Sequence, residues 1–320
     1  MTSRTPSTLA PRGIPSSLSL QRMLATTLST VLADLVAAET PLAAPASPPG
    51  TPPQSLRLSR DPQDMAYLYR PGYPATDAGG QIQGSGLPLD LAARWNALSS
   101  SRDIPSLDVG SLPLTPFLAD YLSAHTSASI LAQGQLLLRP SATALRVWLW
   151  AFADTCPPPP EPRRAVSLSF PHKQAPLAEA LQLSPLALLQ YTHMRCHRLA
   201  QTCPPPPAEP RIAPSPDPRG IALSSSTPTQ QKLWRALVTL VDDLAADPLP
   251  PTSDPDYPAL PLLQQGFLKG YALCVAVDVW LRELSGQPPC PHASLMLQGI
   301  THSLAHLLQG WFQVPAPPRL

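Results

Sequence analysis

Residues 184–201 read SPLALLQYTHMRCHRLAQ, and this stretch decides how the second half of the chain folds. Ser184 is a suitable N-cap, and Pro185 suits the first helical position, where its missing N–H group would have no partner. At 100° per residue, one side of the predicted helix carries five residues that can enter a core: Leu186, Leu189, His193, Cys196 and Ala200. The stretch therefore predicts a helix that packs on one side.

The opposite side of this helix carries Tyr191, Arg195 and Arg198 at spacings i, i+4 and i+7. An aromatic ring between two guanidinium groups suits unstacked bases and their phosphates, which favours RNA contacts. The alternative is a tyrosine at the edge of the core beside two solvated arginines. Lys269 and Arg319 are further candidates for phosphate contacts.

A family resemblance rests first on residues 190–195, QYTHMR. This segment resembles the Q-Y-x-H-x-R pattern that opens the DALR anticodon-binding domain of arginyl-tRNA synthetases. The tail at 304–320, LAHLLQGWFQVPAPPRL, is similar to the family's leucine- and glycine-rich turn and short terminus. Ser294 and Leu320 stand where the family usually has arginine and methionine. The resemblance implies an all-α bundle over 184–320 that binds the anticodon stem-loop of tRNA, with arginine-accepting tRNA as one candidate.

A second resemblance covers residues 16–138, with SLQRML at 19–24, RDPQD at 60–64 and PLDLA at 88–92. These motifs occur in the order of the N-terminal additional domain of the same synthetases. The resemblance implies a small α+β module, placed here at 16–152, that touches the outer corner of tRNA. The fold class predicted for the whole chain is therefore α+β.

Local patterns in the first half predict its elements. Apolar spacing indicates a helix over Leu18–Val36, and a short strand is predicted at 55–58. Tyr67, Tyr69 and Tyr73 are expected in a loop rich in glycine and proline. Further helices are expected from Leu87 and over 117–131, and weak alternation predicts one or two strands in 135–152.

Proline shapes the domain organisation, with 46 prolines among 320 residues. Such a composition predicts folded modules joined by stiff linkers. The expected organisation has a disordered leader at 1–15, a linker at 153–183 and a flexible insertion at 202–226. A duplicated motif, TCPPPP, starts at Thr155 and at Thr202. Each copy predicts a short polyproline II segment, which serves as a spacer or as a ligand for a proline-recognising domain.

Apolar stripes in the second half predict three more helices, which begin near Thr227, Leu262 and His292. With the helix at 184–201, a four-helix arrangement buries these stripes. Residues 184–320 contain nine basic and nine acidic side chains, so RNA binding there needs a local patch. A second function stays open: a helical protein-interaction module that has lost RNA recognition and docks on a synthetase or another partner.

Catalytic signatures are missing from the sequence. It contains neither the HIGH-like nor the KMSKS-like motif of a synthetase, and no P-loop or nucleophile elbow. No enzymatic activity, cofactor or metal is therefore expected. His193 is expected in the core, and His302 and His306 lie four apart without an evident third ligand.

The five cysteines form no C-x-x-C pair, which favours reduced thiols in a cytoplasmic protein. No apolar run reaches 18 residues, so no membrane contact is expected. Residues 1–33 contain three arginines and no acidic residue, which also fits an organellar transit peptide.

Overall fold

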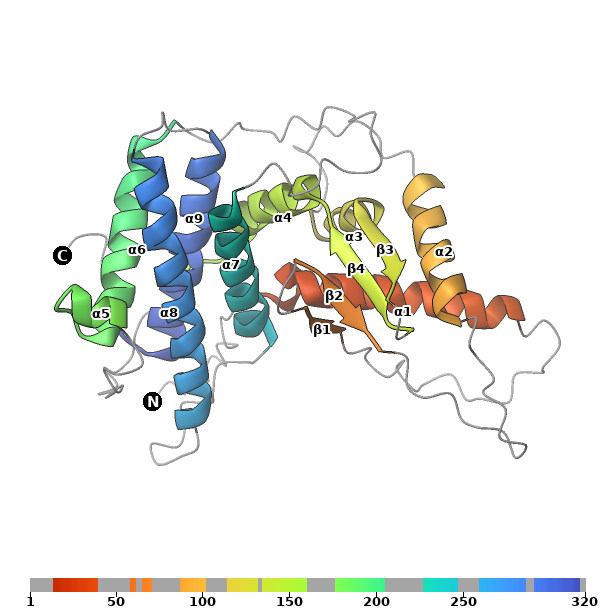
Figure 1. The fold of residues 1–320 in the computed structure, drawn as a ribbon, viewed down its shortest axis with the longest axis horizontal. Coiled ribbons are helices and arrows are strands. Elements are labelled where there is room, and N and C mark those ends of the chain that lie inside the picture. Colours follow the sequence, from red (N-terminus) through yellow and green to blue (C-terminus); the bar gives the residue numbers. More distant parts are fainter. Residues whose placement is uncertain are drawn as a thin grey trace, which may run out of the picture. The chain divides into compact units, whose positions relative to one another are not determined.

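The computed structural model describes residues 14–39, 58–61, 65–70, 87–101, 114–131, 134–159, 176–204, 227–246, 259–285 and 291–316. The chain forms two compact units (Figure 1). An α+β unit contains Leu20–Ala151, and a helical unit contains the residues up to Ser19, Phe152–Ala208 and Pro228–Leu320. The described residues are mostly helical with one antiparallel sheet, which confirms the predicted α+β class. None of the described helices is both long and apolar enough to span a membrane.

The α+β unit is built on a four-stranded antiparallel sheet. Its strand order is β1 (Leu58–Arg60), β2 (Tyr67–Tyr69), β4 (Leu136–Pro140) and β3 (Thr126–Ile130). The register pairs Ser59 with Leu68, Leu68 with Leu137, and Ala128 with Leu138. The unit's helices are α1 (Leu20–Glu39), α2 (Leu87–Ser101), α3 (Leu114–Ala124) and most of α4 (Ala142–Thr155).

Amide side chains satisfy backbone groups on both edge strands. On β3, the Asn96 side chain of α2 donates to the carbonyl of Ala128 at 2.9 Å and accepts from its N–H at 3.0 Å. On β1, the Gln21 side chain of α1 donates to the carbonyl of Leu58. Edge strands otherwise expose free donors and acceptors to other chains, so these amides fix the sheet within its unit.

Three local predictions in this unit are wrong. The helix expected over 117–131 ends at Ala124, and residues 126–130 form β3, where Thr126 and Ala128 alternate into the core. The strands expected over 135–152 reduce to β4, because Ser141 accepts a hydrogen bond from the N–H of Ala144 at 3.1 Å and starts α4. Tyr67 and Tyr69, expected in a loop, form β2 with both rings buried; Tyr73 lies outside the described residues.

The helical unit contains the predicted four-helix arrangement. Its long helices are α6 (Pro185–Thr202), α7 (Pro228–Ala246), α8 (Ala259–Leu284) and α9 (Pro291–Ala305), and a π-helical turn (His306–Trp311) continues α9. Both α6 and α7 pack against α8 and α9, so apolar stripes from all four helices meet in one core. A short helix, α5 (Pro176–Ala180), packs on α6 within the segment predicted as a linker.

Two glycines let α8 approach the C-terminal turn closely. A Cβ atom at Gly266 would lie 2.7 Å from the Trp311 ring, which is closer than real contacts allow. A Cβ atom at Gly270 would overlap the side chain of Leu307 and lie 3.3 Å from Leu189 of α6. The inner face of α8 therefore requires residues without side chains at these two positions.

The N-terminal residues belong to the helical unit, although the prediction placed residues from 16 onward in the α+β module. A 3₁₀ turn (Ser16–Leu18) packs against α7 with Leu18 buried. The Ser19 hydroxyl donates to the carboxylate of Asp242 on α7 at 2.9 Å, and Asp242 is only 1% exposed. A buried carboxylate needs such donors, so this bond ties the two segments together.

Replacement of Ser19 by alanine tests this attachment. The change removes a donor from a buried carboxylate, so the free energy of unfolding should fall by about 1–3 kcal/mol. Urea unfolding followed by circular dichroism measures the difference. The control is Ser17→Ala at an exposed neighbouring position; equal destabilisation by both changes would contradict the assigned role of Ser19.

Candidate nucleic-acid interface

Helix α6 carries the candidate interface and begins as its sequence predicts. The Ser184 hydroxyl accepts a hydrogen bond from the N–H of Ala187 at 3.2 Å, and Pro185 occupies the first turn. Leu189, His193 and Cys196 are buried, as predicted for the inner side of the helix, whereas Leu186 and Ala200 are only half-buried. These contacts fix the rotation of α6 and therefore decide which residues face outward.

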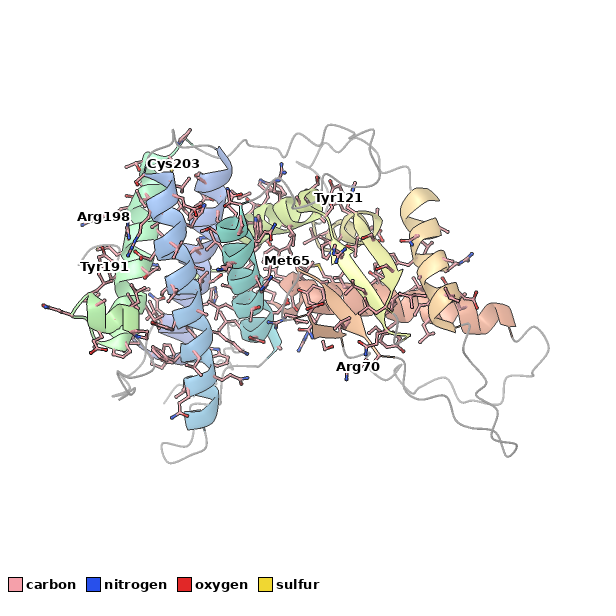
Figure 2. All side chains as sticks on the ribbon, viewed as in Figure 1. Met65, Arg70, Tyr121, Tyr191, Arg198 and Cys203 are labelled. Carbon is pink, nitrogen blue, oxygen red and sulfur yellow. The ribbon has the colours of Figure 1, made fainter. Side chains whose placement is uncertain are left out.

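Tyr191, Arg195 and Arg198 lie along the other side of α6, as Figure 2 shows for the labelled Tyr191 and Arg198. Tyr191 is half-buried, the Arg195 side chain is 35% exposed, and Arg198 is exposed. Arg195 and Arg198 are three residues apart, so their side chains share one helix face. The structure therefore brings together the three predicted residues of this helix.

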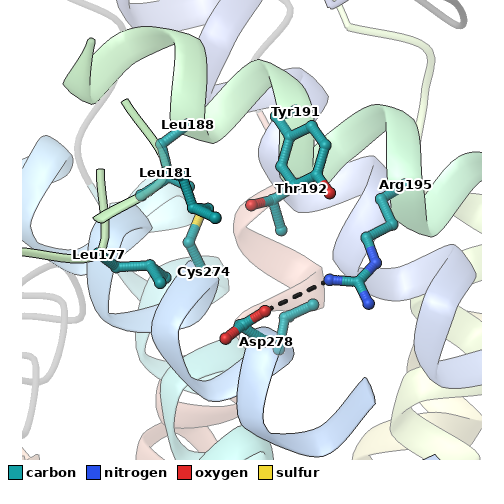
Figure 3. Close-up of a pocket in the computed structure, with 9 residues that line it drawn as sticks. Leu177, Leu181, Leu188, Tyr191, Thr192, Arg195, Cys274 and Asp278 are labelled. Carbon is teal, nitrogen blue, oxygen red and sulfur yellow. Dashed lines mark hydrogen bonds and ion pairs between the residues drawn. The ribbon is translucent and has the colours of Figure 1, made fainter. Parts of the chain in front are cut away.

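Asp278 on α8 connects this face to the neighbouring helix. Its carboxylate accepts from Arg195 Nη1 at 3.3 Å through Oδ1 and from Arg282 Nη2 at 2.6 Å through Oδ2 (Figure 3 shows the first contact). We call Arg195, Arg198 and Arg282, with Asp278, the arginine cluster. Two of the three guanidinium groups share one carboxylate, so the cluster keeps a positive charge in a chain that is nearly neutral overall.

A shallow pocket adjoins the arginine cluster between α5, α6 and α8 (Figure 3). It is a small depression with room for about one water molecule, about 10 Å³, so a larger ligand would lie across its mouth. Its walls are mainly apolar, and its polar groups come from Tyr191, Thr192, Arg195 and Asp278. Such a surface offers a ring for stacking beside a fixed guanidinium group, which is the pairing used to hold a single unstacked base.

Lys269 and Arg319 do not join this surface in the described residues. Lys269 forms an ion pair with Asp243 of α7, whereas Asp278 faces α6. Lys269 therefore lies on a different side of α8 from Arg195, and its role as a phosphate contact stays a prediction. Arg319 lies outside the described residues.

Asp278 and Arg282 were missed as site residues. Their i, i+4 spacing on a helix predicts an ion pair between them. The contact between Asp278 and Arg195 joins residues 83 positions apart, which no local pattern reveals. The cluster therefore needed the three-dimensional arrangement of α6 and α8.

The helical unit also brings a cysteine and a histidine together. Cys156 Sγ lies 3.3 Å from His306 Nε2, and the same nitrogen lies 2.9 Å from the carbonyl oxygen of Pro157. A carbonyl only accepts, so Nε2 carries the proton and cannot take one from the thiol. Burial raises the pKa of Cys156 to about 12 and lowers the pKa of His306 to about 4. The pair therefore anchors the first four-proline run and does not form an activated nucleophile.

The parts of the chain that the structure describes hold no group of three or more histidine, cysteine or acidic side chains suited to a metal ion. Cys196 and Cys274 are fully buried, and burial raises the pKa of each thiol. Burial likewise lowers the pKa of His302.

The neutral state of His306 predicts a pH dependence of stability. Its pKa is lower in the folded chain than the usual 6.5. The unfolded chain therefore binds more protons between pH 6.5 and 4, so the free energy of unfolding should fall as the pH is lowered through this range. One such residue contributes up to about 3 kcal/mol.

The matched variant is His306→Gln, because glutamine keeps an N–H donor for the Pro157 carbonyl but does not titrate. Thermal unfolding between pH 7.5 and about 4.5 should give a melting temperature that changes less with pH for this variant than for the wild type. If the melting temperatures of the variant and the wild type change equally with pH, His306 is not the source of the pH dependence of stability.

No protein-family model matches the chain, and neither a curated protein nor a solved structure matches it. The class of protein proposed below therefore depends on the arginine cluster, the neighbouring pocket and the arrangement of the helices.

Proposed function

We propose that this chain is a non-catalytic RNA-binding protein whose helical unit binds the anticodon stem-loop of a tRNA. The observation that carries the proposal is the arginine cluster beside Tyr191, which combines three guanidinium groups with an aromatic ring on adjoining helices. The guanidinium groups would bind phosphates, and the ring would stack on an unpaired base. Arginine-accepting tRNA is the first ligand to test.

The role of Asp278 in this proposal is to position arginines. Its side chain is 17% exposed and holds both Arg195 and Arg282. Both guanidinium groups are therefore ordered before RNA binds, so less side-chain entropy is lost on binding. Arg198 is exposed, and none of the ion pairs formed among the described residues involves it. The cluster therefore offers about three phosphate contacts and predicts modest, salt-sensitive affinity.

The order of elements in the α+β unit supports the proposed resemblance to arginyl-tRNA synthetases. A helix, a strand pair, two helices, a second strand pair and a further helix follow one another from α1 to α4. Of the motifs that resemble the additional domain of arginyl-tRNA synthetases, SLQRML leads into α1 and PLDLA lies on α2, whereas residues 62–64 of RDPQD lie outside the described residues. In the proposal this unit contacts the outer corner of the tRNA, and arginyl-tRNA aminoacylation is the process that the protein serves without catalysing it.

A second candidate function is a protein-interaction module that docks on a synthetase or another partner. The observation that favours it is the exposure of three large apolar side chains on α8, Leu268, Val275 and Val279. Exposed apolar residues on one helix face are typical of protein contacts and are not used to hold phosphates. The two candidates use different surfaces, so each is testable without the other.

Arg198→Ala tests the electrostatic part of the RNA proposal, because it disturbs no recorded ion pair. With three phosphate contacts, wild-type affinity for labelled tRNA should fall roughly 20- to 40-fold between about 50 and 200 mM salt. The variant should bind several-fold more weakly at low salt, and its slope of log affinity against log salt should shrink by about 1. Lys232→Ala, which removes an exposed cation from α7, is the control.

Tyr191 tests the stacking part separately. Loss of one stacked base costs about 1–3 kcal/mol, so Tyr191→Leu should weaken binding at least fivefold, whereas Tyr191→Phe keeps the ring and the affinity. Fluorescence anisotropy with an anticodon stem-loop oligonucleotide measures both. An absence of binding by the wild type at about 50 mM salt would reject the RNA proposal.

A further inference from the structure

The outer face of α8 carries an apolar stripe, which we call the α8 stripe. It consists of Leu268, Ala272, Val275 and Val279. Leu268 and Val279 are each 46% exposed, Val275 is 37% exposed, and Ala272 is also exposed. The intervals of four, three and four residues are those of a coiled-coil seam. The stripe lies opposite the face that carries Gly266 and Gly270, so it does not contribute to the core of its own unit.

Polar contacts fix both borders of the α8 stripe. Figure 1 shows α8 between α6 and α7. On the α7 side, Lys269 pairs with Asp243, and Glu283 accepts from Thr229 at 2.6 Å. On the α6 side, Asp278 holds Arg195. Neighbouring helices thus hold the charges at the borders, and the stripe between them is uncharged.

We propose that the α8 stripe is the contact between two copies of this chain, with α8 antiparallel to α8. A two-fold axis between Ala272 and Val275 places Leu268 opposite Val279 and Ala272 opposite Val275. Each layer then pairs a larger with a smaller side chain, which allows the two helices to interdigitate. The stripe is therefore complementary to itself in this direction, as a two-fold interface requires.

Charges at the borders favour the antiparallel direction. In an antiparallel pair the α7 borders of both copies meet, so Lys269 of one copy lies beside Glu283 of the other, twice by symmetry. The lysine ammonium has three donors and can keep Asp243 while it contacts a second carboxylate. A parallel pair would instead place Asp278 beside Glu283 of the second copy, which brings two carboxylates together.

The size of the α8 stripe sets the strength of the contact. The twelve residues from Leu268 to Val279 cover about 16 Å of helix, which is short for a standard interface. The dimer should therefore be concentration-dependent, with a dissociation constant on the order of 10–100 µM. The inference does not rest on RNA binding, because the stripe shares no member with the arginine cluster.

Sedimentation equilibrium of the full chain, from about 5 to 500 µM, tests for the dimer. The wild type should shift from monomer to dimer, and Val275→Glu should remain monomeric at every concentration, because it buries a charge in both central layers of the seam. The matched control is Leu89→Glu, which changes an exposed leucine that is 63% exposed on α2. A wild type that stays monomeric, or a Val275→Glu variant that dimerises like the wild type, overturns the proposal.

A cysteine pair tests the direction. A mixture of Leu268→Cys and Val279→Cys proteins should form an oxidised heterodimer, because the two positions face each other. Either variant alone should not cross-link through the new thiol, since its own copies lie about 16 Å apart along the helix. Wild-type protein controls for the native thiols. Efficient cross-linking of Leu268→Cys with itself would indicate parallel pairing and overturn the proposed arrangement.

Discussion

The close approach of α8 to the C-terminal turn is the constraint on which the helical unit depends. Gly266 and Gly270 present no side chains there, so Trp311 and Leu307 reach the backbone of α8. This contact fixes the rotation of α8 about its axis. Once that rotation is fixed, Lys269 faces α7, Asp278 faces α6, and the α8 stripe faces away from the core. Every surface proposed for function therefore follows from the packing of two glycines.

The two proposed surfaces have different physical characters. The arginine cluster works through charge, because three arginines lie beside a single carboxylate, Asp278, which pairs with two of them, in a chain whose formal net charge is only +1. The α8 stripe works through apolar area and carries no charge of its own. A salt increase weakens the first kind of contact and leaves the second largely unchanged. The two surfaces adjoin on α8, because Arg282 lies seven residues after Val275 and therefore on the same side of the helix.

Sequence patterns predicted the helical half better than the α+β half, and the reason is physical. Helix α6 follows from local signals, since Ser184 caps it and apolar residues recur at helical spacing. Strand β2 has only three residues and depends on its pairing with β4, about 70 residues further along the chain, so Tyr67 and Tyr69 looked like a loop. The site shows the same limit. Tyr191, Arg195 and Arg198 were readable from one helix, whereas the link from Arg195 to Asp278 required the tertiary fold.

Gly266→Ala gives the most direct measurement of the central claim, because two effects predict opposite signs. Alanine favours a helix over glycine by about 1 kcal/mol, so the change would stabilise a helix with open space at this position. The packing described here leaves no room for the methyl group beside the rigid Trp311 ring. We therefore predict that urea unfolding will show a net loss of about 1–3 kcal/mol. A variant as stable as the wild type, or more stable, would contradict the account.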